Sequence, residues 1–175
     1  MKHIRIAIAA AALLATAAVL PAAAFDCTPV QIGIAGEAFQ LFPNETDVIG
    51  LRLNLVASRN DTVSGIDAGI VSLGADIQAL RVNLYNGSDY RFCGVEAGLI
   101  NRDAALAGLA VALFNTVSGD VSGMQIGAFN NANFMTGMQI GIFNHANSLR
   151  GIQIGLINLI EDGPLSFFPV LNMAF

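Results

Sequence analysis

Two acidic residues, Asp67 and Glu96, occupy equivalent places in a repeated pattern and could serve together as general acid and base. Each follows an arginine that holds the same place one repeat earlier, so the order along the chain is Arg52, Asp67, Arg81, Glu96. Opposite charges on neighbouring strands attract, whereas like charges would repel. The alternation therefore favours a structural charge network over acid–base catalysis, and we expect the chain not to be an enzyme.

The other residue types that carry chemistry are scarce or badly spaced. His145 is the only histidine after the amino-terminal segment and falls in an expected turn, where it would be solvated. It has no histidine partner, and Cys27 and Cys93 lack metal-ligand spacing. The recurring glycines lie inside strands, whereas a phosphate cradle needs glycine between a strand and a helix. We predict no cofactor, metal or catalytic residue, and the sequence identifies no small-molecule substrate.

The chain begins with the pattern of an exported protein. A basic head, an apolar run and small residues up to Ala24 predict a secretory signal peptide over residues 1–24. Residues 25–175 then form a single β-repeat domain. In an oxidising compartment the remaining cysteines, Cys27 and Cys93, would form a disulfide by default, with two free thiols as the alternative.

The charge of the exported part weighs against nucleic acid as a partner. Two basic residues leave with the signal peptide, which gives 8 − 2 = 6 basic against 13 acidic residues and a net charge of −7. No lysine remains. Because binding to nucleic acid requires basic residues that neutralise phosphates, this class of function is disfavoured.

The elements that hold these residues are tandem copies of one pattern, Gly-x-Gln-x-Gly-x-x-Asn. Three nearly identical copies start at Gly123, Gly137 and Gly151, and the earlier copies are degraded. Apolar and other residues alternate with a period of two, which predicts β-strands. From Arg52 onward the central positions recur every 14–15 residues, and the full series is Gln31, Arg52, Asp67, Arg81, Glu96, Ala110, Gln125, Gln139, Gln153 and Phe167.

Strands repeated in this way predict an all-β fold, and we expect a small antiparallel β-barrel of about ten strands. The core Gly-Ile-Gln-Ile-Gly reads the same in both directions, so it can meet itself across an antiparallel pair. The alternating charges would then point into a polar lumen filled by side chains. The last strand, with Leu171, Met173 and the terminal Phe175, resembles the assembly signal of bacterial outer-membrane barrels.

A β-solenoid, in which each repeat is one coil and like residues stack in ladders, is the alternative. The recurrent asparagine suits such a ladder as well as it suits the end of a strand. Membrane barrels carry aromatic girdles, but this chain has no Trp and only 2 Tyr. Phe175 also falls on the glutamine side of the last strand unless a bulge near Pro169 resets the alternation. The sequence leaves both architectures open.

The copies at Gly137 and Gly151, together with the ending from Glu161 to Asn172, resemble a bacterial surface-repeat family first described in spirochaetes. The resemblance is strong from about Gly94 to the end. It implies a cell-envelope address and supplies no activity, because the family is mostly uncharacterised. The leading hypothesis is a small outer-membrane barrel with a largely filled lumen, in contact with outer-membrane lipid. The alternative is a secreted or periplasmic solenoid that serves as an interaction or adhesion module.

Overall fold

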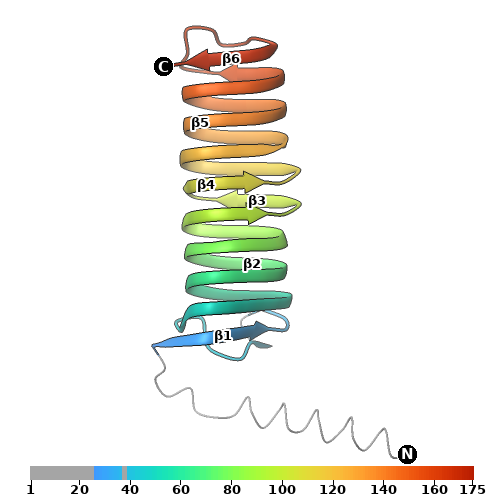
Figure 1. Cartoon of the computed structure of the whole chain (residues 1–175), viewed down its shortest axis with the longest axis vertical. Helices are drawn as coiled ribbons and strands as arrows, with labels where there is room; N and C mark the ends of the chain where they lie inside the picture. Colours follow the sequence, from blue (N-terminus) through green and yellow to red (C-terminus); the bar gives the residue numbers. More distant parts are fainter. Residues whose placement is uncertain (1–25, 37–38) are drawn as a thin grey trace, which may run out of the picture.

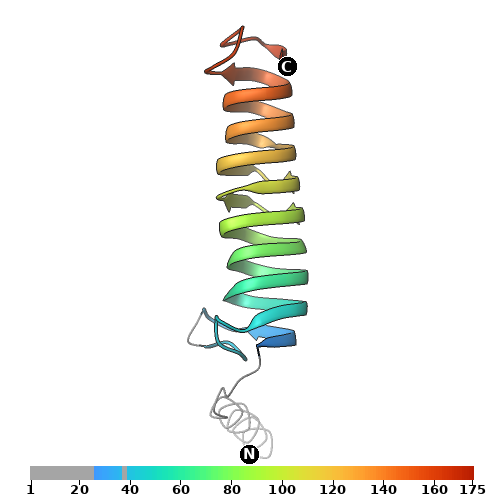
Figure 2. The same cartoon turned by 90° about the vertical axis from the view of Figure 1, so that its left-hand side faces the viewer.

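The computed structural model describes residues 26–36 and 39–175, so the signal peptide expected over residues 1–24 lies outside the described residues. The described part of the chain forms one sheet and contains no helix. Two of its strands, of 51 and 47 residues, wind through several turns of a coil (Figures 1 and 2). The strands are β1 (Cys27–Gly33), β2 (Asp47–Ala97), β3 (Ile100–Asp103), β4 (Leu106–Val111), β5 (Phe114–Ile160) and β6 (Val170–Ala174).

Neighbouring turns of the coil run parallel and lie one repeat apart. Phe92 in β2 pairs with Leu106 in β4, which is 106 − 92 = 14 residues later. Leu106 in turn pairs with Val121 in β5, which is 121 − 106 = 15 residues later. One repeat is therefore one full turn, and successive turns are about 4.8 Å apart, the usual spacing of paired strands.

The expected antiparallel barrel is wrong in its strand direction, although the all-β class is confirmed. Among the described residues, antiparallel pairing is limited to β6 on the last part of β5 and to two isolated bridges. The nearly symmetric repeat fits either direction, so the sequence pattern could not decide. Parallel stacking prevails because it pairs a repeat position with the same position one turn later, so that Asn101 pairs with Asn115 and Gly108 with Gly123.

Each turn has two halves that sort polar and apolar side chains in opposite ways. In the turn that starts at Gly137, Gln139 is buried and the apolar side chains on either side of it lie on the outer surface. Further along the same turn, Leu149 is buried and Arg150 is exposed. We call the outer surface of the first half the apolar face and that of the second half the polar face. The apolar core lies behind the polar face and includes Val63, Ile77, Phe92, Leu106, Val121, Met135 and Leu149.

A column of glycines marks the start of the turns and explains why the repeat begins with this residue. Gly137 has a φ of 132°, in the region that favours glycine. A Cβ atom on Gly137 would lie 2.0 Å from the carbonyl oxygen of Gly123, one turn earlier. Gly65 stands in the same relation to Gly50, at 2.1 Å. The backbone of one turn thus occupies the space that a side chain on the next would need.

Both ends of the coil are covered. At the amino-terminal end, β1 pairs in parallel with the start of β2, and the segment that follows β1 is held by Gln40, whose side-chain amide donates to the carbonyl of Arg59 at 2.9 Å. At the other end, β6 turns back and pairs antiparallel with β5 (Figure 1). Covered ends of this kind are typical of stacked-repeat proteins, whose terminal turns would otherwise expose open strand edges.

Candidate functional site

The four charged residues singled out in the sequence lie inside the coil, fully buried, at the centres of successive turns. Arg52 and Asp67 form an ion pair, with 2.6 Å between the guanidinium Nη2 and the carboxylate Oδ2. Arg52 also donates to the carbonyl of Leu73 at 2.8 Å, and Asn54 donates to the other oxygen of Asp67 at 2.6 Å. Burial alone would raise the pKa of Asp67, but the charge of Arg52 and the hydrogen bonds from Arg52, Ser72 and Asn54 lower it below its ordinary value.

The second arginine holds two carboxylates. Arg81 pairs with Glu96, and its Nη2 also lies 2.8 Å from Oδ1 of Asp103, a residue that sequence reasoning missed. The guanidinium carbon of Arg81 sits 4.4 Å from the centre of the Phe92 ring. Burial, followed by the nearby charge of Asp103, raises the pKa of Glu96 well above its ordinary value.

In later turns, amide ladders replace the charges. Gln139 donates to Gln125, and Gln153 donates to Gln139, each at 2.8 Å. The recurrent asparagine forms a second buried ladder, in which Asn130 donates to Asn144 at 2.8 Å. Because every ladder amide lies behind the backbone of the coil, these groups are inaccessible to a substrate. Their chemical role is to satisfy one another in the interior.

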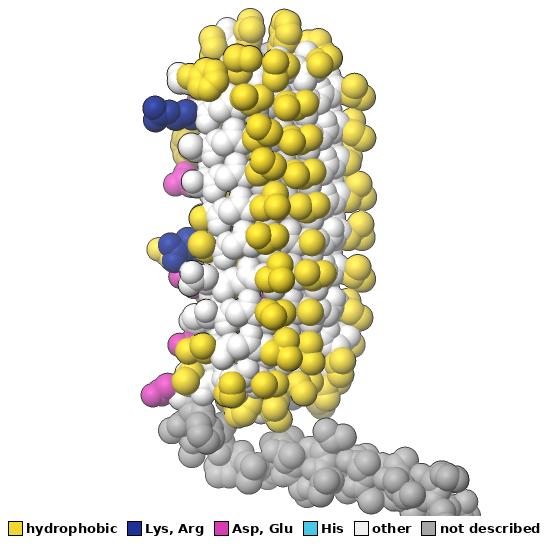
Figure 3. Space-filling model, in the orientation of Figure 1, with side chains coloured by type: hydrophobic (Ala, Val, Ile, Leu, Met, Phe, Trp, Pro, Cys, Tyr) yellow, Lys and Arg dark blue, Asp and Glu magenta, His cyan; other side chains and the backbone are white. Residues whose placement is uncertain are grey.

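The accessible feature is the apolar face, which continues from turn to turn (Figure 3). Its side chains form columns along the coil that follow the strand register, in which Val30 pairs with Leu51 and Leu109 with Met124. Charged residues are absent from its four columns over the described turns. The columns contain Val30, Leu51, Ile66, Leu80, Val95, Leu109, Met124, Met138 and Ile152; Ile32, Leu53, Ala68, Val82, Ala97, Val111, Ile126, Ile140 and Ile154; Ile34, Leu55, Ile70, Leu84, Leu99, Leu113, Ala128, Ile142 and Leu156; and Ala35, Val56, Val71, Tyr85, Ile100, Phe114, Phe129, Phe143 and Ile157.

The size of the apolar face follows from strand geometry. Eight steps from turn to turn separate Val30 from Ile152, which gives a length of about 40 Å. Five residues along the strand separate Met138 from Phe143, which gives a width of about 16 Å. The projected area is therefore about 600 Å². Because individual side chains such as Leu84 remain 59% exposed, the accessible area is larger than the projection.

Both cysteines are free thiols in the structure, and the expected disulfide between them is absent. Cys27 lies in β1 beside Asp47, and Cys93 follows Asp47 by 93 − 47 = 46 residues, or three turns. Four steps of about 4.8 Å therefore separate the two thiols along the coil, a gap of roughly 19 Å. A disulfide needs Cα atoms within about 7 Å. The sequence interval could not reveal this separation without the turn length.

His145 lies within β5 and not in the expected turn, because the strand continues through this segment. Its Nδ1 atom is 2.6 Å from Oδ1 of Asn131, and its Nε2 atom is 3.1 Å from Oε1 of Glu161. Among the described residues, no three His, Cys, Asp or Glu side chains are grouped so that they could hold a metal ion. The histidine joins neighbouring turns of the polar face.

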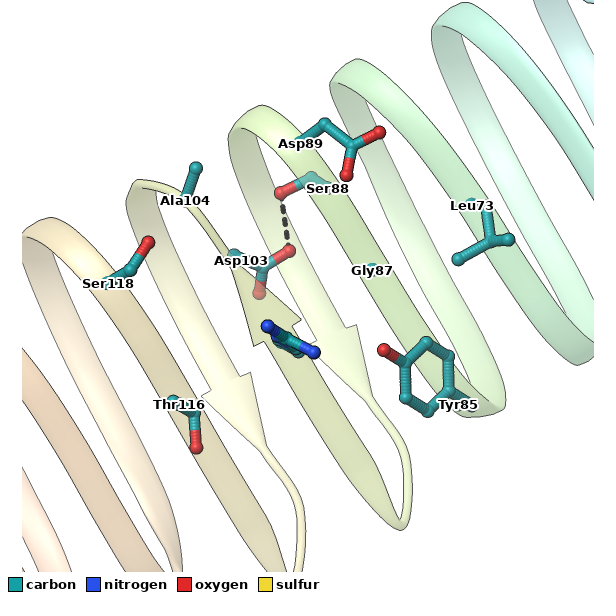
Figure 4. A pocket seen from close by; sticks show the side chains of 10 residues that line it. Leu73, Tyr85, Gly87, Ser88, Asp89, Asp103, Ala104, Thr116 and Ser118 are labelled. Atoms are coloured by element: carbon teal, nitrogen blue, oxygen red, sulfur yellow. Dashed lines mark hydrogen bonds between the residues drawn. The ribbon is translucent and has the colours of Figure 1, made fainter.

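A depression of about 430 Å³ lies beside the turns around β3 (Figure 4). Tyr85, Arg102 and Thr116 line it, and the buried carboxylate of Asp103 forms part of its wall. Ser88 donates to that carboxylate at 2.5 Å. Oδ1 of Asp103 accepts from both Ser88 and Arg81, and Asp89, the other acid in the lining, is paired with Arg59 at 2.5 Å.

No family model, curated protein or solved structure matches this chain. The resemblance to a bacterial surface-repeat family therefore stays a prediction from the repeat pattern. The described residues include no helix that is long and apolar enough to cross a membrane.

Proposed function

We propose that this chain is an exported β-solenoid of the bacterial cell envelope and that it serves, without catalysis, as an interaction or adhesion module. The observation that carries the proposal is the apolar face, which follows one side of the coil from β1 to the end of β5. Charged residues are gathered on the other side of the turns or in the interior. The molecule therefore has one apolar side that can bind a partner and one polar side that is solvated.

The extent of the face supports a docking role. The largest apolar patch on a typical soluble monomer is about 300–600 Å², and larger patches mark sites of interaction with proteins or membranes. The projection of the apolar face alone reaches about 600 Å². Scattered exposed leucines need no explanation, but an unbroken set of columns without a charge does.

The filled interior supports a structural role and argues against conduction of solutes. Ion pairs around Arg52 and Arg81 occupy the first turns, and the glutamine ladder around Gln139 occupies the later ones. Since these groups are paired with one another, passage of a solute would require many buried contacts to break. We therefore expect no porin-like activity.

Contact with outer-membrane lipid is the second candidate function. It is favoured by the parallel stacking, because the hydrogen bonds between turns satisfy the backbone beneath the apolar face. Only a backbone that is satisfied internally can enter an apolar phase at low cost. In this reading the coil would lie on the membrane with its apolar face against the lipid.

The docking proposal is tested by placing a charge on the apolar face and following the location of the exported chain. Ile142 lies on the apolar face and Phe134 lies outside its columns, and both side chains are 53% exposed. We expect Ile142→Glu to release the chain from the envelope fraction of cells, whereas Phe134→Glu leaves it there. Equal behaviour of the two variants, with both folded by circular dichroism, would overturn the proposal.

A further inference from the structure

We propose that the apolar face binds a second copy of this chain, so that two coils pack face to face as a dimer. This inference rests on the proposed function, because it names the partner of the same face. It commits to one occupant on three observations: the area of the face, its uniformity and the chemistry of its border.

The area of the face matches what a stable dimer needs. A standard interface buries about 800 Å² on each partner. The projection of the face is about 600 Å², and the side chains that stand out from it add to this, since Leu84 and Leu156 remain 59% and 67% exposed. Two sheets that pack on each other lie about 10 Å apart, with the side chains of both filling the space between them.

The uniformity of the face makes it complementary to itself. Every turn presents the same four apolar positions, so the columns of one copy can lie in the furrows between the columns of another. Along one margin, Phe114 and Phe129 stack with their ring centres 5.2 Å apart, and Phe143 continues the row at 6.0 Å. A twofold axis brings identical patches together, as in most homodimers.

The border of the face does not suit a membrane surface. Proteins that lie on lipid commonly place Trp, Lys and Arg around their apolar side. Here the chain has no Trp, and residues 25–175 have no lysine and a negative net charge. Within the four columns, Tyr85 is the single tyrosine. Of the two columns that border the face, one contains Ser64, Gln78, Cys93, Ala107, Ser122, Thr136 and Arg150, and the other contains Leu73, Gly87, Arg102, Thr116, Asn131, His145 and Leu159, so over these turns the border carries two arginines and no lysine.

The remaining surfaces explain why assembly stops at two copies. The polar face carries exposed charges such as Asp89, Arg91 and Asp120. One end of the coil is covered by β1 and the segment after it, and the other end is covered by the antiparallel β6. Neither the polar face nor the ends offer a second apolar surface comparable in length with the apolar face. The pairing therefore closes as a dimer.

The test is the mass of the exported chain, purified without detergent and measured by sedimentation equilibrium over a range of micromolar concentrations. We expect a dimer for the native chain and for Phe134→Glu. Leu84→Glu should raise the Kd of the dimer at least about a hundredfold, because the symmetric interface then buries two unpaired carboxylates near its centre. The milder Leu84→Ser should raise the Kd of the dimer about tenfold. This variant keeps the test informative if Leu84→Glu fails to fold.

The outcomes separate this inference from the proposed function. A native chain that is monomeric and floats with phosphatidylcholine vesicles would overturn the dimer in favour of lipid. A native chain that is monomeric and ignores vesicles would also overturn it, yet the docking function would stand if Ile142→Glu still released the chain from the envelope. A dimer that Leu84→Glu leaves intact would show that another surface pairs, and would equally overturn the inference.

Discussion

The turns centred on Arg52 to Glu96 and those centred on Gln125 to Gln153 place different kinds of side chain at equivalent interior positions. In the first region an arginine meets a carboxylate one turn later, with 2.6 Å between Arg52 and Asp67. In the second region one amide donates to the next at 2.8 Å. Glutamine both donates and accepts, so it can bond to its own copy, whereas arginine only donates and must meet an acid.

The difference also appears in what is left without a partner. Among the buried side-chain atoms of the described residues, Arg52 Nε, Glu96 Oε1 and Asp103 Oδ2 lack a hydrogen bond in the charged region. In the glutamine region the unpaired atom is Oε1 of Gln153, where the ladder ends. The glutamine ladder thus leaves an unsatisfied hydrogen-bonding atom only at its end, whereas the charge network leaves such atoms within it. This explains why the repeats that are nearly identical in sequence are those with glutamine at the centre.

The largest expected effect comes from unpairing the charged region. Arg52→Gln leaves Asp67 buried without its cation and should lower the free energy of unfolding by about 3–5 kcal/mol. The double variant Arg52→Gln with Asp67→Gln copies the chemistry of the later turns and should come within about 1 kcal/mol of the native chain. Denaturant unfolding measures both. If the double variant is no more stable than the single one, the two interiors are not interchangeable.

The glycine column runs through both regions, interrupted at Ala79, so its disruption at a glycine of positive φ should cost the same in each. Gly65→Ala and Gly137→Ala both force a Cβ atom against a backbone oxygen at a positive φ. Each should lower the free energy of unfolding by about 3 kcal/mol. Gly87→Ala is the control, because its nearest neighbour is the flexible end of Leu73 at 3.1 Å. Unequal costs at Gly65 and Gly137 would mean that one region relaxes around the added atom.

Interruption of the glutamine ladder should cost less than unpairing a charge. Gln139→Met keeps the length of the side chain but removes the donor to Gln125 Oε1 and one of the two acceptors of Gln153 Nε2. We expect a loss of about 2 kcal/mol in the free energy of unfolding, because buried neutral groups are left unsatisfied. The exposed Gln78→Met serves as the control and should be neutral. A loss as large as that of Arg52→Gln would contradict the contrast between the regions.

The smallest effect is expected from the isosteric Glu96→Gln and depends on pH. The pKa of Glu96 is raised above its ordinary value of 4.5, so above that pH the folded chain keeps a proton that the unfolded chain releases. The stability contributed by this proton is complete below pH 4.5 and is lost as the pH rises through the folded-state pKa. The variant should therefore gain stability over the native chain as the pH rises above about 4.5.

Asp67 provides the opposite control for the pH experiment. Its pKa is lowered below 3.8, so its contribution is present above that pH and is lost as the pH falls through the folded-state pKa. Unfolding in urea across the pH range separates the two carboxyl groups. A difference between Glu96→Gln and the native chain that does not change with pH would show that folding does not raise the pKa of Glu96.

The sequence predicted the β-structure, the repeat length and the order of the buried charges, because all three depend on local spacing. The unit centred on Phe167 was wrong, since Phe167 forms only an isolated antiparallel bridge with Leu159. It could not predict the direction of pairing, since Gly-x-Gln-x-Gly is nearly symmetric. The position two residues before the centre offered a missed signal: its glycine at Gly65 or Gly137 has no role in an antiparallel pair, but it is required where backbones stack at a positive φ.

The two sides of the strand were separated correctly in sequence, and the charged side of the motif was also expected to point inward, where Arg52, Asp67, Arg81 and Glu96 are buried. Apolar side chains normally point to the core, and here those of the motif point out. The core is supplied by the other half of the turn, where Ile77, Phe92 and Leu106 recur at intervals of 15 and 14 residues. Asp103 was missed because it belongs to this second half and not to the central series.

Each turn of the coil stacks only on its two neighbours. The length of the coil can therefore change by insertion or deletion of whole turns. Removal of the turn from Gly137 to Arg150 would bring Gly151 onto Gly123 with the same contacts, and the coil would shorten by about 4.8 Å. In the charged region the removal of a single turn would set like charges against each other, so arginine and acid must be lost or duplicated together. The glutamine region therefore grows by one turn at a time, and the charged region grows by two.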